Sequence, residues 1–243
     1  MSDTTPTRGQ VIAGGPDQRR AERRPRRRYG ALLLCATCLL AVQGVFPPGR
    51  VQQLLVAVLA GACLVLAVRD ADLSLVVLRW ALALAAAVLV VSVLRAVAGG
   101  VSEGAARLCI AALLGLGPPA VAIGVVRDVR SSGRVELGAI SGVLALYLLV
   151  GMAFAFVYGG IDRLASEPFF ASGADATVSR CLYFSFTTLT TVGYGDLTAG
   201  ADLGRTLAIF EALMGQIYLV TVVSLLVGNL RRPAPVAPSR SDR

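Results

Sequence analysis

Residues 190–196 read TTVGYGD, and this short polar stretch lies between two long apolar segments. Successive peptide carbonyls can point the same way along a strip of backbone only if its residues alternate between ordinary and left-handed conformations. Glycine adopts left-handed conformations without a steric penalty, and Gly193 and Gly195 supply that freedom at alternate positions. The motif therefore predicts a row of carbonyl oxygens that can bind a dehydrated cation.

The segment before the motif is too short to cross a membrane. Residues 177–189 are apolar and aromatic, but these 13 residues would extend only about 20 Å as a helix. The hydrocarbon core of a bilayer is about 30 Å thick. The segment therefore predicts a re-entrant helix, followed by non-helical backbone that is tolerated at membrane depth because it lines a watery cavity. A turn that merely links two helices is the alternative, which this context disfavours.

With this context, the chain resembles the potassium channel family, whose selectivity filter has the same signature. The resemblance implies that K⁺ is the permeant ion and that no other cofactor is needed. Its ligands would be the backbone carbonyls of Thr191, Val192, Gly193 and Tyr194 and the Thr191 hydroxyl, with Gly195 completing the filter. Because one chain supplies one loop, three identical subunits would have to join it around a common axis.

The resemblance also gives roles to residues around the filter. Thr190 and Asp196 flank it, and Asp196 is expected at the outer mouth, adding negative charge and a hydrogen bond behind the filter. Tyr183 and Phe184 occupy the positions of an aromatic cuff, with ordinary interface aromatics as the alternative. A bacterial member of the family has glutamate where this chain has Thr187. A threonine hydroxyl cannot share a proton with Asp196, so the inactivation behaviour of that channel does not transfer.

Composition independently predicts an integral membrane protein. Hydrophobic residues make up 56% of the 243 residues, and the mean hydropathy is +0.71. Six stretches approach or exceed the roughly 17–25 residues that a tilted helix needs to span a bilayer. They are residues 29–46, 51–68, 73–94, 106–126, 137–158 and 203–230. We therefore expect an all-α fold of six transmembrane helices that assembles as a tetramer, with the re-entrant helix and filter between the fifth and sixth spans.

Arginine placement predicts the orientation and the domains. Residues 1–28 hold eight arginines and three acids, which predicts a cytoplasmic N-terminus, and six spans would return the C-terminus to the cytoplasm. The expected location is the plasma membrane. This basic arm is expected to be disordered and to attract anionic lipid, at roughly 1 kcal/mol per arginine. A four-helix transmembrane domain (29–136), a pore domain (137–230) and a short cytoplasmic tail (231–243) follow. We read the net charge of +8 as membrane topology, not as a nucleic-acid surface.

The fourth predicted span does not resemble a voltage sensor. A sensor helix repeats arginine at every third residue so that several charges move in the field. Here Arg107 stands at the start of the span, and no charged residue follows until Arg127. Pro118 and Pro119 are also expected to break the helical hydrogen-bond ladder. The sequence therefore predicts weak voltage dependence.

Two residues of the last span are candidates for gating. Glu211 is an acid deep within an apolar span, and burying it unpaired is costly, so it should face protein. It is expected either to brace the re-entrant helix through Ser185, Thr187 or Thr188, or to titrate and couple pH to gating. Gly215 is either a hinge, as in archaeal relatives, or a site of close helix packing.

Enzymatic chemistry finds no support in the sequence. The chain has no histidine, and Cys35 and Cys38 lack the second ligand pair of a metal or redox site, so the five cysteines are read as packing residues. The predicted function is passive, potassium-selective conduction by a homotetramer. A poorly selective cation channel and a non-conducting sensor or scaffold subunit are the alternatives.

Overall fold

The computed structural model describes residues 29–47, 49–98, 102–132 and 137–230, and within these ranges the regular secondary structure is helical. The all-α prediction is confirmed for this part. The predicted basic arm (1–28) and cytoplasmic tail (231–243) lie outside the described residues. The helices are α2 (Gly30–Val45), α3 (Arg50–Asp70), α4 (Leu75–Ala98), α5 (Glu103–Ser132), α6 (Leu137–Leu164), α7 (Val178–Leu189) and α8 (Asp202–Leu230).

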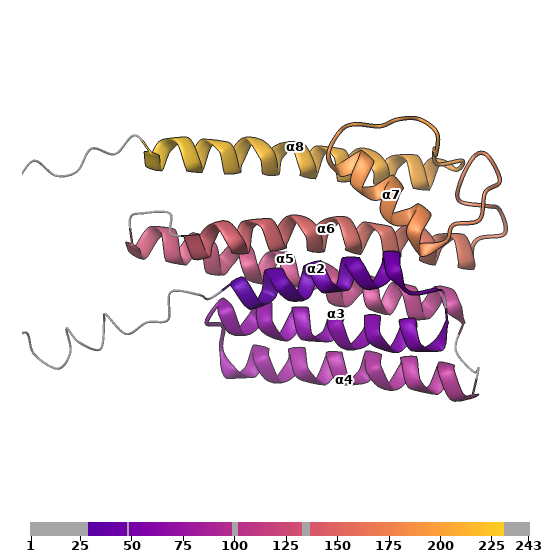
Figure 1. The fold of residues 1–243 in the computed structure, drawn as a ribbon, viewed down its shortest axis with the longest axis horizontal. Coiled ribbons are helices and arrows are strands. Elements are labelled where there is room, and N and C mark those ends of the chain that lie inside the picture. Colours follow the sequence, from indigo (N-terminus) through magenta and orange to yellow (C-terminus); the bar gives the residue numbers. More distant parts are fainter. Residues whose placement is uncertain (1–28, 48, 99–101, 133–136, 231–243) are drawn as a thin grey trace, which may run out of the picture.

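The long helices run side by side along the longest axis of the molecule (Figure 1). Helix α6 is central, because α5 and α2 pack on it from one side and α7 and α8 from the other. Helix α3 lies between α2, α4 and α5. The short helix α7 and the loops on either side of it lie at one end of the bundle, which we call the loop end (Figure 1).

Five of the helices are long and apolar enough to cross a membrane. They are α3, α4, α5, α6 and α8, with apolar segments of 21 to 27 residues. Helix α2 has 16 residues, or about 24 Å at 1.5 Å per residue, which is less than the roughly 30 Å of a hydrocarbon core. Five of the six predicted spans are therefore found with the required length, and the crossing by α2 stays a prediction.

The predicted break in the fourth span does not occur. Pro118 and Pro119 lie inside α5, which continues for 30 residues from Glu103 to Ser132. Residues on both sides of the prolines are fully buried, including Leu113, Leu114 and Val121. Packing against α3 and α6 therefore holds the two halves in line, as neighbouring helices do for prolines in membranes.

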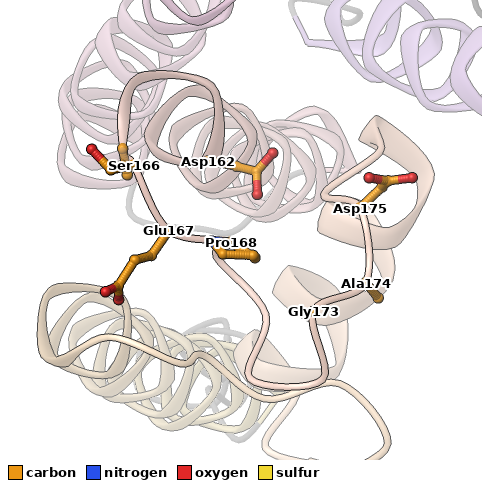
Figure 2. A pocket seen from close by; sticks show the side chains of 8 residues that line it. Asp162, Ser166, Glu167, Pro168, Gly173, Ala174 and Asp175 are labelled. Atoms are coloured by element: carbon orange, nitrogen blue, oxygen red, sulfur yellow. The ribbon is translucent and has the colours of Figure 1, made fainter.

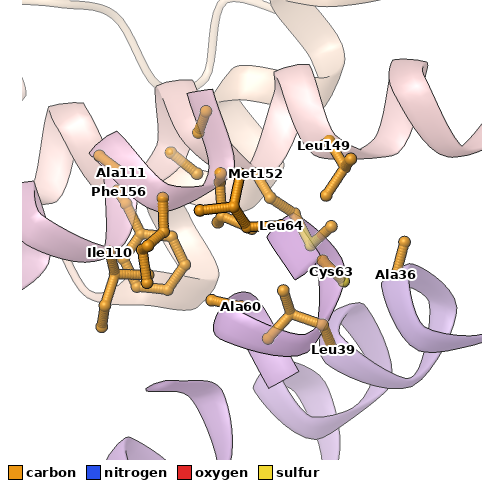
Figure 3. Packing of buried hydrophobic residues seen from close by; sticks show 14 of the residues in the cluster. Ala36, Leu39, Ala60, Cys63, Leu64, Ile110, Ala111, Leu149, Met152 and Phe156 are labelled. Atoms are coloured by element: carbon orange, nitrogen blue, oxygen red, sulfur yellow. The ribbon is translucent and has the colours of Figure 1, made fainter. Parts of the chain in front are cut away.

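The N-terminal helices share an apolar core with α6. Figure 3 shows Leu64 of α3 beside Met152 of α6, and Ile110 of α5 beside Phe156 of α6. Leu39 of α2 lies near Ala60 and Cys63 of α3. Small residues between these side chains allow the helices to approach one another closely. The core fixes the position of α6, and α6 in turn supports α7.

The cysteines take part in this packing in an unexpected pair. Cys63 is buried, and its sulfur lies 3.4 Å from that of Cys35 on the neighbouring helix, while Cys38 is exposed. The spatial neighbour of Cys35 is therefore Cys63, and not Cys38, which is closer in the sequence.

Candidate functional site

The loop at residues 190–196 has the alternating backbone that its sequence predicts. Thr191, Gly193 and Gly195 have φ angles of 60°, 52° and 81°, whereas Val192 and Tyr194 between them are not in this region. The left-handed positions therefore begin at Thr191, two residues before the first glycine. A left-handed conformation costs a residue with a side chain about 1–2 kcal/mol, so surrounding contacts must hold Thr191 in place.

Helix α7 supplies those contacts at the start of the loop. The carbonyl oxygen of Thr187 accepts hydrogen bonds from the amides of Val192 and Gly193, at 2.9 and 3.0 Å, and the Thr188 carbonyl accepts one from Thr191 at 2.9 Å. In a trans peptide the C=O points away from the N–H. Because the amides of Val192 and Gly193 point back at α7, the carbonyls of Thr191 and Val192 point away from it.

The side-chain hydroxyls of Thr187 and Thr190 donate hydrogen bonds to carbonyls of α7. Thr190 Oγ1 donates to the Phe186 carbonyl at 2.6 Å, and Thr187 Oγ1 donates to the Phe184 carbonyl at 3.0 Å. Thr187 therefore supports the loop through its backbone oxygen. Its hydroxyl is directed at its own helix.

Two further backbone hydrogen bonds hold the chain beyond the loop. The Ala171 amide donates to the Thr198 carbonyl at 2.9 Å, and the Gly200 amide donates to the Phe169 carbonyl at 2.8 Å. The stretch that precedes α7 is thus tied to the stretch that leaves the loop. The loop is held at both ends.

Between these two sets of hydrogen bonds, residues 190–196 lie at the surface of the chain. All seven residues are exposed, including 52% of Val192 and 72% of Tyr194. An added Cβ at Gly193 or Gly195 would have no neighbour within 4 Å. The carbonyl row that the backbone creates is therefore open to whatever adjoins this face of the chain.

The two aromatic residues predicted as a cuff point in different directions. Tyr183 stacks on Tyr194, with ring centroids 6.2 Å apart and planes 7° apart. Desolvation and a hydrogen bond to the Asp196 carboxylate raise the pKa of the Tyr183 hydroxyl above its ordinary value. Phe184 is buried on the opposite side of α7, edge-on to Tyr158 and Phe169. Tyr183 is thus beside the loop, and Phe184 anchors α7 in the core.

Glu211 of α8 is fully buried behind α7 and faces protein, as expected. Its Oε2 accepts a hydrogen bond from the Tyr158 hydroxyl at 2.7 Å, and its Oε1 is in hydrogen-bond contact with Ser185 Oγ. Ser185 Oγ also lies 2.6 Å from the Gly151 carbonyl oxygen. Of the three partners considered from the sequence, the structure pairs Glu211 with Ser185, and it adds Tyr158.

Proton counting gives the protonation state that fits this network. Three contacts join Tyr158, Glu211, Ser185 and the Gly151 carbonyl, and each contact needs one proton. The two hydroxyls supply two protons, because a serine hydroxyl donates once. The third proton must belong to the Glu211 carboxyl, which then donates to Ser185 Oγ. With an unshared proton at each contact, the network therefore corresponds to a neutral Glu211.

Gly215 lies where α8 touches the end of α7. A Cβ at this position would stand 2.0 Å from the Leu189 carbonyl oxygen, and α8 runs through Gly215 without interruption. Gly151 of α6 is similar, since a Cβ there would be 2.8 Å from the Phe186 ring. Both glycines permit a close approach to α7. The structure therefore gives Gly215 a packing contact, and a hinge role stays a prediction.

An acidic cavity of about 220 Å³ lies at the loop end, between the end of α6 and the segment before α7. Figure 2 shows Asp162, Glu167 and Asp175 around it. Asp162 accepts a hydrogen bond from the Phe169 amide at 3.0 Å and thereby holds the start of the aromatic cluster. These three acids, Asp162, Glu167 and Asp175, give this cavity a negative charge.

Sequence reasoning did not identify three residues that support the site. They are Thr191 as the first left-handed position, Tyr158 as a partner of Glu211, and Arg107, which donates to the carbonyls of Gly159 and Ala176. Tyr158 and Glu211 are 53 residues apart in the sequence, and Arg107 and Ala176 are 69 apart. Only the unusual position of an arginine at the end of an apolar span could have drawn attention to Arg107.

The helices that form this site match a known family. Residues 142–232, which include most of α6 and all of α7 and α8, match the family model described as ion channel. Protein LctB of Geobacillus stearothermophilus is 31% identical over 106 residues, which cover 41% of this chain and 78% of that protein. The chain therefore belongs to this ion channel family, and it is a multi-pass membrane protein.

Two further relatives are named as potassium channel proteins. The inward rectifier potassium channel Kirbac3.1 of Paramagnetospirillum magnetotacticum is 31% identical over 91 residues, covering 37% of this chain and 29% of the relative. The human delayed-rectifier potassium channel regulatory subunit KCNS2 is 33% identical over 86 residues, covering 35% and 17%. The match thus spans less than a third of either relative. No solved structure matches the chain at comparable significance.

Proposed function

We propose that this chain forms a potassium-selective channel in the plasma membrane, with residues 191–195 as its selectivity filter. The observation that carries the proposal is the alternation of left-handed residues at Thr191, Gly193 and Gly195. Together with the amides that point back at α7, it directs carbonyl oxygens away from the chain. Such a row can replace the hydration shell of K⁺. Thr191, Val192, Gly193 and Tyr194 would supply the ligands.

The proposed channel is a homotetramer. The loop is open on the side opposite α7, so one chain can form only part of a ring of oxygens, and cyclic symmetry would close it. Among the described helices, α8 contacts only α6 and α7. It exposes a row of large apolar side chains along most of its length: Leu203, Ile209, Phe210, Leu213, Met214, Ile217 and Val220. An apolar face of this size is typical of a protein or lipid contact.

The proposed orientation places the loop end outside the cell and both termini in the cytoplasm. Asp196 in the loop and the acids of the cavity lined by residues 162–175 support this, because carboxylates at an outer mouth concentrate cations. Helix α5 has no charged residue between Arg107 and Arg127, so little charge can move in the membrane field. Single-channel recordings should therefore show weak voltage dependence. Activation that carries several elementary charges would contradict this part of the proposal.

A second function deserves a direct test. One relative is named a regulatory subunit, which is consistent with a chain that keeps the pore fold and does not conduct by itself. The exposed, fully formed loop favours conduction. The two functions differ in whether the purified chain alone passes ions.

Ion flux into liposomes tests the proposal. The purified chain should pass K⁺ at least about tenfold faster than Na⁺, which corresponds to a difference of about 1.4 kcal/mol between the two ions, and Ba²⁺ should block the flux. Equal passage of K⁺ and Na⁺ would indicate a poorly selective cation channel. No flux from folded, oligomeric protein would indicate the non-conducting subunit.

A further inference from the structure

A polar cavity of about 320 Å³ lies among the N-terminal helices at the loop end, away from the 190–196 loop. Its walls come from the end of α2, the start of α3, the end of α4, the starts of α5 and α7, and Phe156 of α6. Charged and amide side chains line it: Gln43, Arg50, Gln52, Gln53, Arg95, Glu103 and Arg107. A polar cavity of this kind between apolar helices requires a physical explanation, since buried polar groups are costly unless paired.

The charges around the cavity do not balance. Three arginines line it, Arg50, Arg95 and Arg107, against the single carboxylate of Glu103. Glu103 is already shared, because its oxygens lie 2.6 Å from Arg107 Nη2 and 3.5 Å from Arg95 Nη2. Arg163, outside the cavity, reaches the same carboxylate at 3.8 Å. The cavity therefore keeps an excess of positive charge.

Two buried donors at this cavity have no hydrogen-bond partner within the part of the chain that the structure describes. Gln43 is 5% exposed, and its Nε2 is unpartnered, although its Oε1 accepts from Gln52. Arg95 Nη1 is likewise buried and unpartnered. Leaving such a donor unsatisfied destabilises the folded chain. Both groups belong to residues that line the cavity, and an acceptor of negative charge would satisfy them.

We propose that this cavity binds a phosphate group, with Arg95 and Gln43 as its donors and Arg50 at its entrance. Arginine suits phosphate because its planar guanidinium matches the spacing of two phosphate oxygens. The cavity lies at the ends of α2–α5, the depth at which phospholipid headgroups meet transmembrane helices. An anionic phospholipid is therefore the expected source, and free phosphate is the soluble source of the same chemistry.

The site adjoins the segment that carries the 190–196 loop. Arg107, in the cavity wall, is 8% exposed and donates through Nη1 to the carbonyls of Gly159 and Ala176 at 3.1 and 2.9 Å. Ala176 immediately precedes Thr177, the N-cap of α7. A ligand that fixes the cavity wall would thus also fix the start of α7. The binding proposal itself does not depend on which ion the protein conducts.

Ligand-induced thermal stabilisation of the full chain, purified in detergent, tests the site. We expect phosphatidylglycerol to raise the melting temperature and phosphatidylcholine, which has no net charge, to raise it much less. Inorganic phosphate identifies the source. If it stabilises the chain as well as the lipid does, the phosphate group alone is the ligand, and the site stands. If neither phosphatidylglycerol nor inorganic phosphate stabilises the chain, the proposal is overturned.

Matched variants locate the binding. Arg95→Gln should weaken the apparent affinity for phosphatidylglycerol at least about tenfold, because it removes a charge-assisted hydrogen bond. Arg50→Gln should weaken it less without affecting folding, since Arg50 is exposed. The control is Arg163→Gln, which also loses an ion pair with Glu103 but does not line the cavity. Equal weakening by the control would place the lipid elsewhere.

Gln43→Leu separates ligand binding from a structural role. It removes a buried unpartnered N–H group and only a long, 3.4 Å hydrogen bond from the partly exposed Gln52, so the ligand-free chain should melt at the same temperature or higher. The stabilisation by phosphatidylglycerol should nevertheless shrink. A purely structural Gln43 would show the opposite result, with a lower ligand-free melting temperature and an unchanged response to lipid.

Discussion

Glycine has opposite roles in the 190–196 loop and in the helices behind it. In the loop, Gly193 and Gly195 have positive φ angles and open space around them. In α8 and α6, Gly215 and Gly151 are helical, and an added Cβ would stand 2.0 and 2.8 Å from atoms of α7. The loop therefore needs glycine for its backbone conformation, whereas the helices need it for close contact. The comparison separates changes that distort the loop from changes that displace its support.

The largest effect is expected at the helix contact. Gly215→Ala should destabilise the chain by more than the about 1–3 kcal/mol typical of overpacking, because the obstructing atom is a backbone carbonyl oxygen that cannot rotate away. The yield of monodisperse protein in size-exclusion chromatography measures this. The control is Gly115→Ala, an exposed position in α5 with nothing within 4 Å. Normal assembly of Gly215→Ala would show that α8 is not packed as described.

In the loop, the expected loss is of function. Gly193→Ala should fold and assemble, because its Cβ has no neighbour within the chain, but the strained conformation costs about 1–2 kcal/mol. The carbonyl row should be distorted, and K⁺ flux into liposomes should fall at least about tenfold, which corresponds to about 1.4 kcal/mol. Flux and selectivity equal to those of the unchanged chain would refute the filter assignment.

Substitutions of Glu211 in the buried network should have an intermediate effect on stability, and its size should depend on whether the new side chain can form hydrogen bonds. Glu211→Ala should lower stability by about 1–3 kcal/mol, because it leaves the buried Tyr158 hydroxyl without an acceptor, whereas Ser185 keeps the Gly151 carbonyl. Glu211→Gln should be nearly neutral, because its amide N–H can donate to Ser185 as the protonated carboxyl does. Thermal unfolding of the two variants measures the difference. If Glu211→Gln is as unstable as Glu211→Ala, the neutral carboxyl is wrong.

The smallest effect is expected where the loop meets Tyr183. Tyr183→Phe keeps the stacking on Tyr194 but removes the hydroxyl that forms a hydrogen bond with Asp196, and the loss is small because this hydroxyl is exposed to solvent. Selectivity should persist, and K⁺ flux should change by less than about tenfold. Phe184→Leu is the contrasting change, because it alters the core and should lower stability while leaving the loop-facing side of α7 intact.

Local features of this molecule were predictable from the sequence, and contacts between distant segments were not. The helix ends agree with the predicted spans to within six residues, because apolar runs are local signals. The largest differences are at the ends of α5 and α6, which continue past the apolar runs to Ser132 and Leu164. The left-handed glycines follow from the motif. Thr191 could not be predicted in this conformation, since β-branched residues disfavour it.

The loop is supported by contacts between residues that are far apart in the sequence, and nothing in the sequence indicates which residues pair. Glu211 was expected to have a partner on α7, but the choice of Ser185 and the addition of Tyr158 depend on how α6, α7 and α8 pack. The prolines of α5 also show that local sequence is not sufficient to predict the fold. Proline normally ends a helix, but tertiary packing overrides this signal at Pro118 and Pro119. The distant contacts of Arg107 likewise appear only in the fold.

The most direct test of the filter is the reversal potential of the purified chain in a planar bilayer, with K⁺ on one side and Na⁺ on the other. The alternating backbone of residues 191–195 predicts a potential close to the K⁺ equilibrium value, with K⁺ at least about tenfold more permeant, or about 1.4 kcal/mol. A reversal potential near zero, with both cations equally permeant, would contradict the assignment.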